Sequence, residues 1–191
     1  MVNKFYLPSI ETRDGFRPFD PILTMFEPQN FSTAIFVIEY CSILFGFFYV
    51  LSRPHKLLTI LYSFGTMYLI RLICILAVPF IEPSGLIELY DPVVNSLLLH
   101  NGFLKRDLFF SGHMASMFLI FLYMEGRLLK WIFGLLSLFL AYFLLCQHVH
   151  YSYDLVAAMV FAFVSKLLSE KFIGSLSDYE HLETVSDTLK V

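Results

Sequence analysis

Five stretches of this chain are long and apolar enough to cross a lipid bilayer, and this feature restricts the fold more than any other. A spanning helix needs about 20 mostly apolar residues, because only a helix or closed barrel satisfies its backbone hydrogen bonds away from water. The stretches are 32–51, 57–80, 108–124, 129–147 and 152–168. We therefore predict an all-α, polytopic integral membrane helix bundle with about five transmembrane spans.

The composition supports this class and excludes others. Hydrophobic residues make up 58% of the chain, against about 45–50% in soluble domains. Charged residues make up only 15%, which excludes intrinsic disorder. The net charge of −3 provides no basic surface for nucleic acid, so we expect none as a partner.

The basic residues predict the orientation. If five spans alternate, the basic connections and the end of the last span fall on one side, which the positive-inside rule makes cytoplasmic. The N-terminal segment, the connection 82–107 and the turn 148–151 are then exoplasmic. The basic residues used here are Arg53, Lys56, Arg127, Lys130, Lys166 and Lys171.

Two polar segments carry the candidate chemistry. DLFFSGH (107–113) stands at the entrance of the third apolar stretch, and HVHYSYD (148–154) stands at the entrance of the fifth. A single histidine at a membrane interface is usually no more than an interfacial polar residue. Because five alternating spans place both segments at one membrane face, we interpret them together as a site.

The spacing of these residues suits phosphoryl transfer. His150 and Asp154 are four residues apart on one helical face, so the carboxylate can orient the imidazole as a nucleophile. His113 can act as general acid for a leaving oxygen. Ser111 and Gly112 precede it at a helix start, where free backbone N–H groups suit a phosphate. Lys105 and Arg106 add positive charge beside that helix start. These groups predict a phosphohistidine mechanism without metal or cofactor.

Zinc is the alternative for the second segment. His148, His150 and Asp154 are ligand types that zinc accepts. His148 and His150 are two residues apart, however, and would diverge on a regular helix. We therefore predict no metal site.

The two segments resemble those of a known family. DLFFSGH resembles the D-x-x-x-S-G-H segment of the sphingomyelin synthases, and HVHYSYDL resembles their H-x-H-Y-[ST]-x-D-[VL] segment. Both segments belong to the type 2 phosphatidic acid phosphatase superfamily of membrane lipid phosphatases and phosphotransferases. Tyr68 and Arg71 fit the Y-x-x-R part of another synthase motif, and RPFDPI (17–22) is similar to a shortened Pro-rich segment.

The chain also departs from this family. Lys105 and Arg106 replace a Cys-Gly pair, Met114 replaces a Thr, and the first of six spans is missing. The classical lipid phosphatases carry an Arg where this chain has Leu144. The second segment therefore favours the sphingomyelin synthase-like branch and leaves the substrate open.

The resemblance implies a reaction and its residues. His150, oriented by Asp154, attacks a phospholipid head group, and His113 protonates the departing diacylglycerol. A lipid alcohol (ceramide or diacylglycerol) then accepts the phospho-head-group. Water as acceptor would make the protein a lipid phosphate phosphatase, and a non-catalytic membrane scaffold is a second alternative. The expected substrate-binding residues are Asp107, Ser111, Gly112, Arg71, Tyr68, Lys105, Arg106, His148 and Tyr151.

Several expectations complete this interpretation. We divide the chain into an exoplasmic segment 1–30, a membrane-embedded catalytic domain 31–169 and a polar, flexible cytoplasmic tail 170–191. The partners are the membrane, a phospholipid donor and a lipid alcohol acceptor, with a homo-oligomer left open. The active site is expected on the exoplasmic face, periplasmic or lumenal. Two intramembrane charges leave alternatives: Arg71 either binds phosphate or pairs with Glu39 between the first two spans.

Overall fold

The computed structural model describes residues 13–91 and 108–188 of the chain. Within these ranges the secondary structure is helical, with one isolated bridge between Phe16 and Phe80. The predicted all-α fold class is therefore confirmed. The elements in chain order are a short 3₁₀ helix η1 (Leu23–Met25), α2 (Ser32–Leu51), α3 (Pro54–Ala77), α5 (Gly112–Tyr123), α6 (Arg127–Cys146) and α7 (Ser152–Thr188).

Three of the described helices, α2, α3 and α6, are long and apolar enough to span a membrane. The bounds of α2 are those predicted for the first apolar stretch. Helix α3 begins three residues earlier than expected, because Pro54 has a backbone suited to the first helical turn. It also ends earlier, at Ala77, and the Arg13 side chain donates to the carbonyl groups of Ile75 and Val78 there.

Helix α5 is shorter than the predicted third span. Its 12 residues extend about 18 Å, less than the roughly 30 Å of a hydrocarbon core. The helix begins after Ser111, whose Oγ accepts a hydrogen bond from the N–H of Met114 at 3.4 Å. It ends at Tyr123; the next residue, Met124, is extended, and Gly126 follows with a positive φ of 84°. The count of five full spans therefore stays a prediction.

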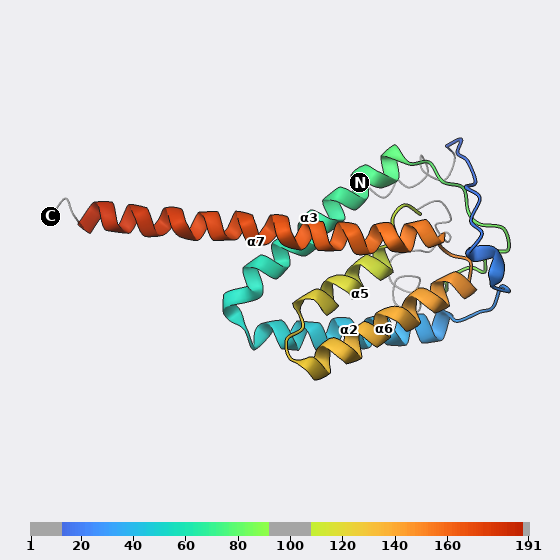
Figure 1. Cartoon of the computed structure of the whole chain (residues 1–191), viewed down its shortest axis with the longest axis horizontal. Helices are drawn as coiled ribbons and strands as arrows, with labels where there is room; N and C mark the ends of the chain where they lie inside the picture. The colour runs from blue at the N-terminus through green and yellow to red at the C-terminus, as the bar shows by residue number, and fades with distance from the viewer. Residues whose placement is uncertain (1–12, 92–107, 189–191) are drawn as a thin grey trace.

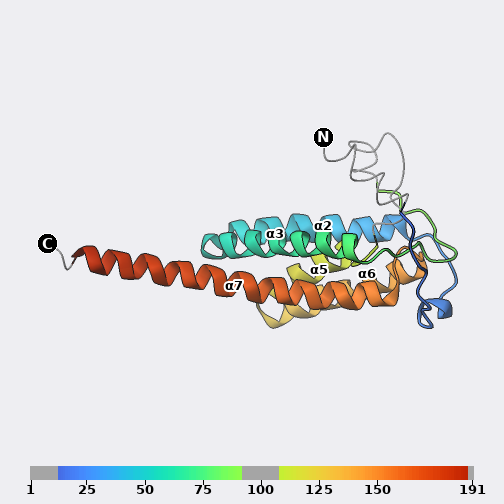
Figure 2. The ribbon, with the colours of Figure 1, turned by 90° about the horizontal axis from the view of Figure 1, so that it is seen from above.

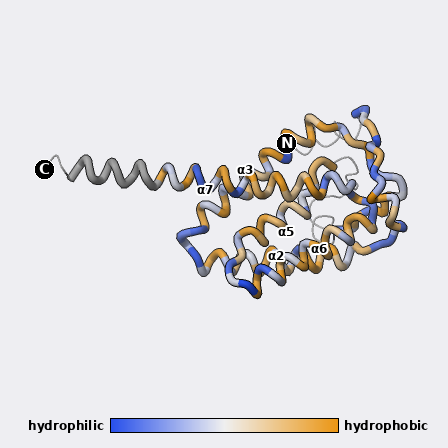
Figure 3. The backbone as a smooth tube through the Cα atoms, in the orientation of Figure 1, coloured by the Kyte–Doolittle hydropathy of each residue, from blue (hydrophilic) through white to orange (hydrophobic). Residues whose placement is uncertain are grey.

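The helices form two layers, and helices that follow one another in the chain run in opposite directions. Figure 2 shows α2 and α3 side by side above α5, α6 and α7. The starts of α2, α5 and α7 and the ends of α3 and α6 lie at one end of the bundle (Figure 1). Both histidine segments therefore lie at this end. Figure 3 shows hydrophobic residues along the helices and hydrophilic residues mainly at the turns.

Helix α7 continues well past residue 168, where the last apolar stretch ends. It runs from Ser152 to Thr188, about 55 Å, and projects beyond the other helices (Figures 1 and 2). Residues 169–188 contain no proline that would end the helix. The backbone of residues 170–188 is thus helical, and the flexibility expected of this tail stays a prediction.

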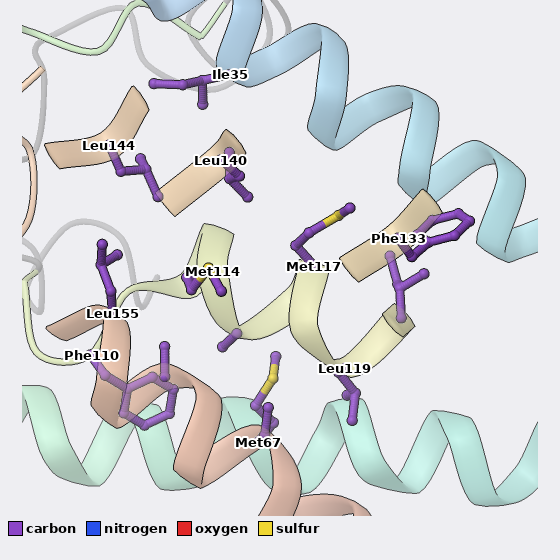
Figure 4. Close-up of a cluster of buried hydrophobic side chains, with 14 of the residues drawn as sticks. Ile35, Met67, Phe110, Met114, Met117, Leu119, Phe133, Leu140, Leu144 and Leu155 are labelled. Atoms are coloured by element: carbon purple, nitrogen blue, oxygen red, sulfur yellow. The ribbon is translucent and has the colours of Figure 1, made fainter. Parts of the chain in front are cut away.

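The core is built around α5. Met114, Met117 and Leu119 of this helix are almost fully buried. Figure 4 shows them between side chains of the other helices, among them Met67 of α3 and Leu140 of α6. His113 lies in the first turn of α5, directly before the buried Met114.

Candidate active site

The structure brings the two histidine segments together. His113 lies in the first turn of α5, and His150 lies two residues before α7 begins. Their ring centroids are 6.4 Å apart, with an angle of 61° between the ring planes. One phosphate ester therefore has both imidazoles within reach.

Asp154 faces His150 and also accepts a hydrogen bond from the turn beside it. Its Oδ2 lies 3.5 Å from His150 Nδ1, and both side chains are buried. The same oxygen accepts the N–H of Tyr151 at 3.0 Å. A separation of 3.5 Å is at the outer limit of a hydrogen bond, and catalytic contacts of this kind commonly tighten when substrate binds. With Nδ1 facing the carboxylate, Nε2 is the nitrogen available for reaction.

The turn between α6 and α7 is held by its own side chains. His148 has a positive φ of 55°, and its Nδ1 and Nε2 lie 2.7 Å and 3.0 Å from the carbonyl oxygens of Ser84 and Phe26. Tyr151 donates its hydroxyl to the carbonyl of Ile81 at 2.8 Å. Burial raises the pKa of the Tyr151 phenol to about 12, so it remains a donor at neutral pH. The substrate-binding roles expected of His148 and Tyr151 stay predictions, since their polar atoms bond to the main chain here.

The start of α5 combines a helix terminus with an arginine. Arg71 of α3 donates from Nε to the carbonyl of Phe110 at 2.9 Å. A methyl group added at Gly112 would lie 3.1 Å from that Nε, so only glycine allows this close approach without a shift. The N–H of Ser111 also contacts the main-chain oxygen of Asp154 at 3.4 Å, which joins the two segments. An anion at this helix start would meet both the N–H groups and the guanidinium.

Glu39 of α2 is a site residue to which we assigned no role in catalysis. Its Oε2 lies 3.6 Å from His113 Nε2, and its side chain is only 13% exposed. The ring of Phe36, one turn earlier, lies 5.9 Å from the His113 ring. A charge within a span predicted that Glu39 faces the bundle interior, but not that it faces His113.

The other expected substrate-binding residues are placed as follows. Tyr68 lies one turn before Arg71 on α3, and its hydroxyl is 3.0 Å from Ser116 Oγ, three residues beyond His113 on α5. Lys105, Arg106 and Asp107 lie outside the described residues, so their roles stay predictions.

Two further polar residues organise this end of the bundle and were missed by sequence reasoning. Gln147 is fully buried; its Oε1 accepts the N–H of Phe31 at 3.0 Å and its Nε2 donates to Ser32 Oγ at 2.8 Å. Asp20 is 4% exposed and binds the start of α7 at Ser152. The RPFDPI segment was the only signal for Asp20, and nothing singled out Gln147.

Metal binding was considered for the second segment. Within residues 13–91 and 108–188, no three His, Cys, Asp or Glu side chains are grouped to hold a metal ion. The ring of His148 faces main-chain carbonyl groups, as described above. The groups best placed to bind an anion are Arg71 and the first turn of α5.

Comparisons with known proteins agree with this geometry. Residues 106–170, which include both histidine segments, match the family model described as PAP2 superfamily C-terminal. The crystal structure of LpxE from Aquifex aeolicus is similar in fold, with a TM-score of 0.54 and 16% sequence identity. That similarity covers 90% of this chain and 96% of LpxE. Comparison with curated proteins gave no match.

These findings confirm the coarser part of the predicted resemblance. The matched segment carries the histidines, and the bundle has the fold of LpxE. They support an integral membrane protein of this helical fold. The phosphatase or phosphotransferase activity and the sphingomyelin synthase-like branch stay predictions.

Proposed function

We propose that this protein is a membrane lipid phosphotransferase of the sphingomyelin synthase-like branch. It moves a phospho-head-group from a phospholipid to ceramide or diacylglycerol through a phosphohistidine on His150. The observation that carries the proposal is the pair of imidazoles 6.4 Å apart, each facing its own carboxylate. This arrangement supplies a nucleophile and an acid–base group for one phosphate ester.

In the first half-reaction, Nε2 of His150 attacks the phosphorus of the donor. The P–O bond to diacylglycerol breaks, and protonated His113 gives its proton to the leaving oxygen. Asp154 stabilises the positive charge that develops on the His150 ring, and Glu39 favours the protonated ring of His113 beforehand. Arg71 and the first N–H groups of α5 bind the phosphate oxygens.

In the second half-reaction, the hydroxyl of the acceptor lipid loses its proton to His113. Its oxygen attacks phosphorus, the N–P bond breaks, and the electron pair returns to His150 Nε2. His113 is protonated again and the cycle is complete. The same residues act in both halves, so the identity of the acceptor decides the product.

An apolar cavity beside the site supports a lipid as substrate. It has a volume of about 350 Å³ and lies among α2, α3 and α5. It begins at Tyr68 and Ser116, within one turn of Arg71 and His113, and continues to Met124 at the far end of α5. Its apolar lining suits an acyl chain of the lipid substrate.

Burial of the reacting groups favours transfer over hydrolysis. The side chains of His150 and Asp154 are 6% and 0% exposed. A transferase must keep water away from its phosphohistidine or hold the acceptor at a high effective concentration. Hydrolysis is the second candidate, because His113 is 28% exposed and leaves a route by which water can enter.

A product analysis tests the proposal. Purified protein is given a phospholipid labelled in its head group, together with ceramide or diacylglycerol, and His150→Ala serves as the inactive control. We expect more label in a new phospholipid than in water-soluble products. Predominant soluble product at saturating acceptor would replace transferase by phosphatase. If His150→Ala keeps its full activity, the phosphohistidine mechanism is contradicted. If the wild-type protein shows no turnover, a scaffold is favoured.

A further inference from the structure

The carboxylate of Asp20 joins the segment before α2 to the start of α7. Its Oδ1 accepts the N–H groups of Ile22 and Leu23, both at 3.0 Å. Its Oδ2 accepts the N–H of Ser152 at 2.6 Å, and Oδ1 also accepts the Ser152 hydroxyl at 2.9 Å. One buried side chain thus closes its own turn and binds a residue 132 positions away.

These four contacts explain why a carboxylate can be buried here. A buried anion is unfavourable unless several donors replace its water. The N–H of Ser152 is among the first of α7, where no main-chain acceptor within the helix is available. A negative charge at a helix N-terminus is also attracted by the helix dipole. The contact between Asp20 and Ser152 is therefore charge-assisted and favourable.

The position of Ser152 connects this contact to the nucleophile. The two residues after His150 donate their main-chain N–H groups to two different carboxylates, Tyr151 to Asp154 and Ser152 to Asp20. On the other side of His150, the ring of His148 is held by main-chain carbonyl groups. Asp20 therefore supplies one of the attachments that hold the main chain on which the His150 imidazole is carried.

We propose that Asp20 is a positioning residue for His150 and acts through Ser152. The segment 17–25 is then a working part of the active site, although it precedes the first long helix. The inference rests on the proposed function, in which His150 is the nucleophile. A displacement of about 1 Å at a reacting group can lower the rate about 100-fold, which sets the size of the expected effect.

The experiment compares two variants of Asp20 with a matched control. Asp20→Asn keeps the shape and removes the charge, and Asp20→Ala removes the side chain. Asn30→Ala is the control, because the Asn30 side chain accepts the N–H of Ser32 at 3.0 Å and so serves the start of α2 at the same end of the bundle. All three lose a hydrogen bond at a helix start, and only the first two lose one beside His150.

The main readout is the single-turnover rate of phosphohistidine formation, with kcat, KM and the melting temperature measured in parallel. We expect Asp20→Ala to lower the rate and kcat about 100-fold with little change in KM, and Asp20→Asn to fall between it and wild type. Asn30→Ala should lower the melting temperature without lowering the rate. If Asp20→Ala does not fold, the isosteric Asp20→Asn decides.

A second readout does not depend on turnover. Diethylpyrocarbonate modifies neutral imidazoles, and the rate at which it modifies His150 can be followed by peptide mass spectrometry. We expect modification of His150 to be several times faster in the Asp20 variants, because the turn is less constrained, and unchanged in Asn30→Ala. If wild type shows no turnover, the proposed function fails while this rate still tests Asp20. If the Asp20 variants behave like Asn30→Ala in both rates, Asp20 is only a stabilising cap and the inference is wrong.

Discussion

Glu39 Oε2 lies 3.6 Å from His113 Nε2, so α2 contributes a carboxyl group beside His113 although neither histidine segment lies on it. The contact joins a residue in the middle of α2 to the first turn of α5. In the proposed mechanism this contact favours the protonated imidazole that the first half-reaction requires. The proposed role of His113 as general acid therefore involves a carboxyl group from another helix.

Replacing Glu39 by glutamine should slow the step that expels the alkoxide. The amide keeps the shape and removes the carboxyl group that faces His113, so we expect kcat to fall about 10²-fold, the lower end of the range for general acid–base catalysis. The rate of diacylglycerol release in a single turnover measures this. Cys41→Ala, on an exposed position of the same helix, is the control and should behave as wild type. An unchanged rate in Glu39→Gln would remove Glu39 from the mechanism.

Phosphoenzyme formation should require His150 and should become much slower without the carboxylate of Asp154. We expect His150→Ala to form no phosphoenzyme, and Asp154→Asn to lose about 10⁴-fold in kcat, because the ring loses its tautomer and its charge partner. Trapping of a labelled phosphoprotein by acid-free gel electrophoresis checks both. Phosphoenzyme formation by His150→Ala would assign the nucleophile elsewhere.

Gly112→Ala should damage the site without destabilising the helix. Alanine is favoured over glycine in a helix by about 1 kcal/mol, yet its methyl group would lie 3.1 Å from Arg71 Nε and displace the guanidinium. We expect a higher KM for the phospholipid at an unchanged or higher melting temperature. Gly174→Ala on α7 is the matched control, because its methyl group would meet no atom within 4 Å. Equal kinetics in the two variants would show that Arg71 tolerates the added methyl group.

Gln147→Ala should lower stability rather than act on chemistry directly. The buried amide serves both the N–H of Phe31 and the hydroxyl of Ser32, and removing it leaves these groups without their partner. Each buried group left unsatisfied costs about 1–3 kcal/mol, so the melting temperature in detergent should fall by several degrees. Gln29→Ala, at an exposed neighbouring position, should change it little. A similar fall in both variants would argue against the role assigned to Gln147.

The orientation in the membrane can be tested with single cysteines. In a background without Cys41, Cys74 and Cys146, we expect Glu88→Cys to react with an impermeant maleimide in intact cells. Leu176→Cys near the other end of α7 should react only after permeabilisation, because the basic connections place that end in the cytoplasm. The opposite pattern would place the histidines on the cytoplasmic face.

Much of the fold could be predicted because it depends on local sequence. A run of 20 apolar residues specifies a helix of that length in lipid, and α2 has the bounds of its run. The spacing of four also predicted that His150 and Asp154 lie close together, although His150 lies two residues before α7, so the turn and not a shared helical face brings the pair to 3.5 Å. The predicted third span was too long for a local reason that apolarity does not reveal, the cap that Ser111 forms at the start of α5.

The order and spacing of residues were enough to predict a helical membrane protein and to single out the two histidine segments. The contacts of Glu39 with His113, of Gln147 with the start of α2, and of Asp20 with Ser152 became visible only in the folded bundle. Each of these contacts depends on how helices are rotated and packed against one another. That packing is the sum of many small, non-directional apolar contacts, so it cannot be predicted from any single residue of the chain.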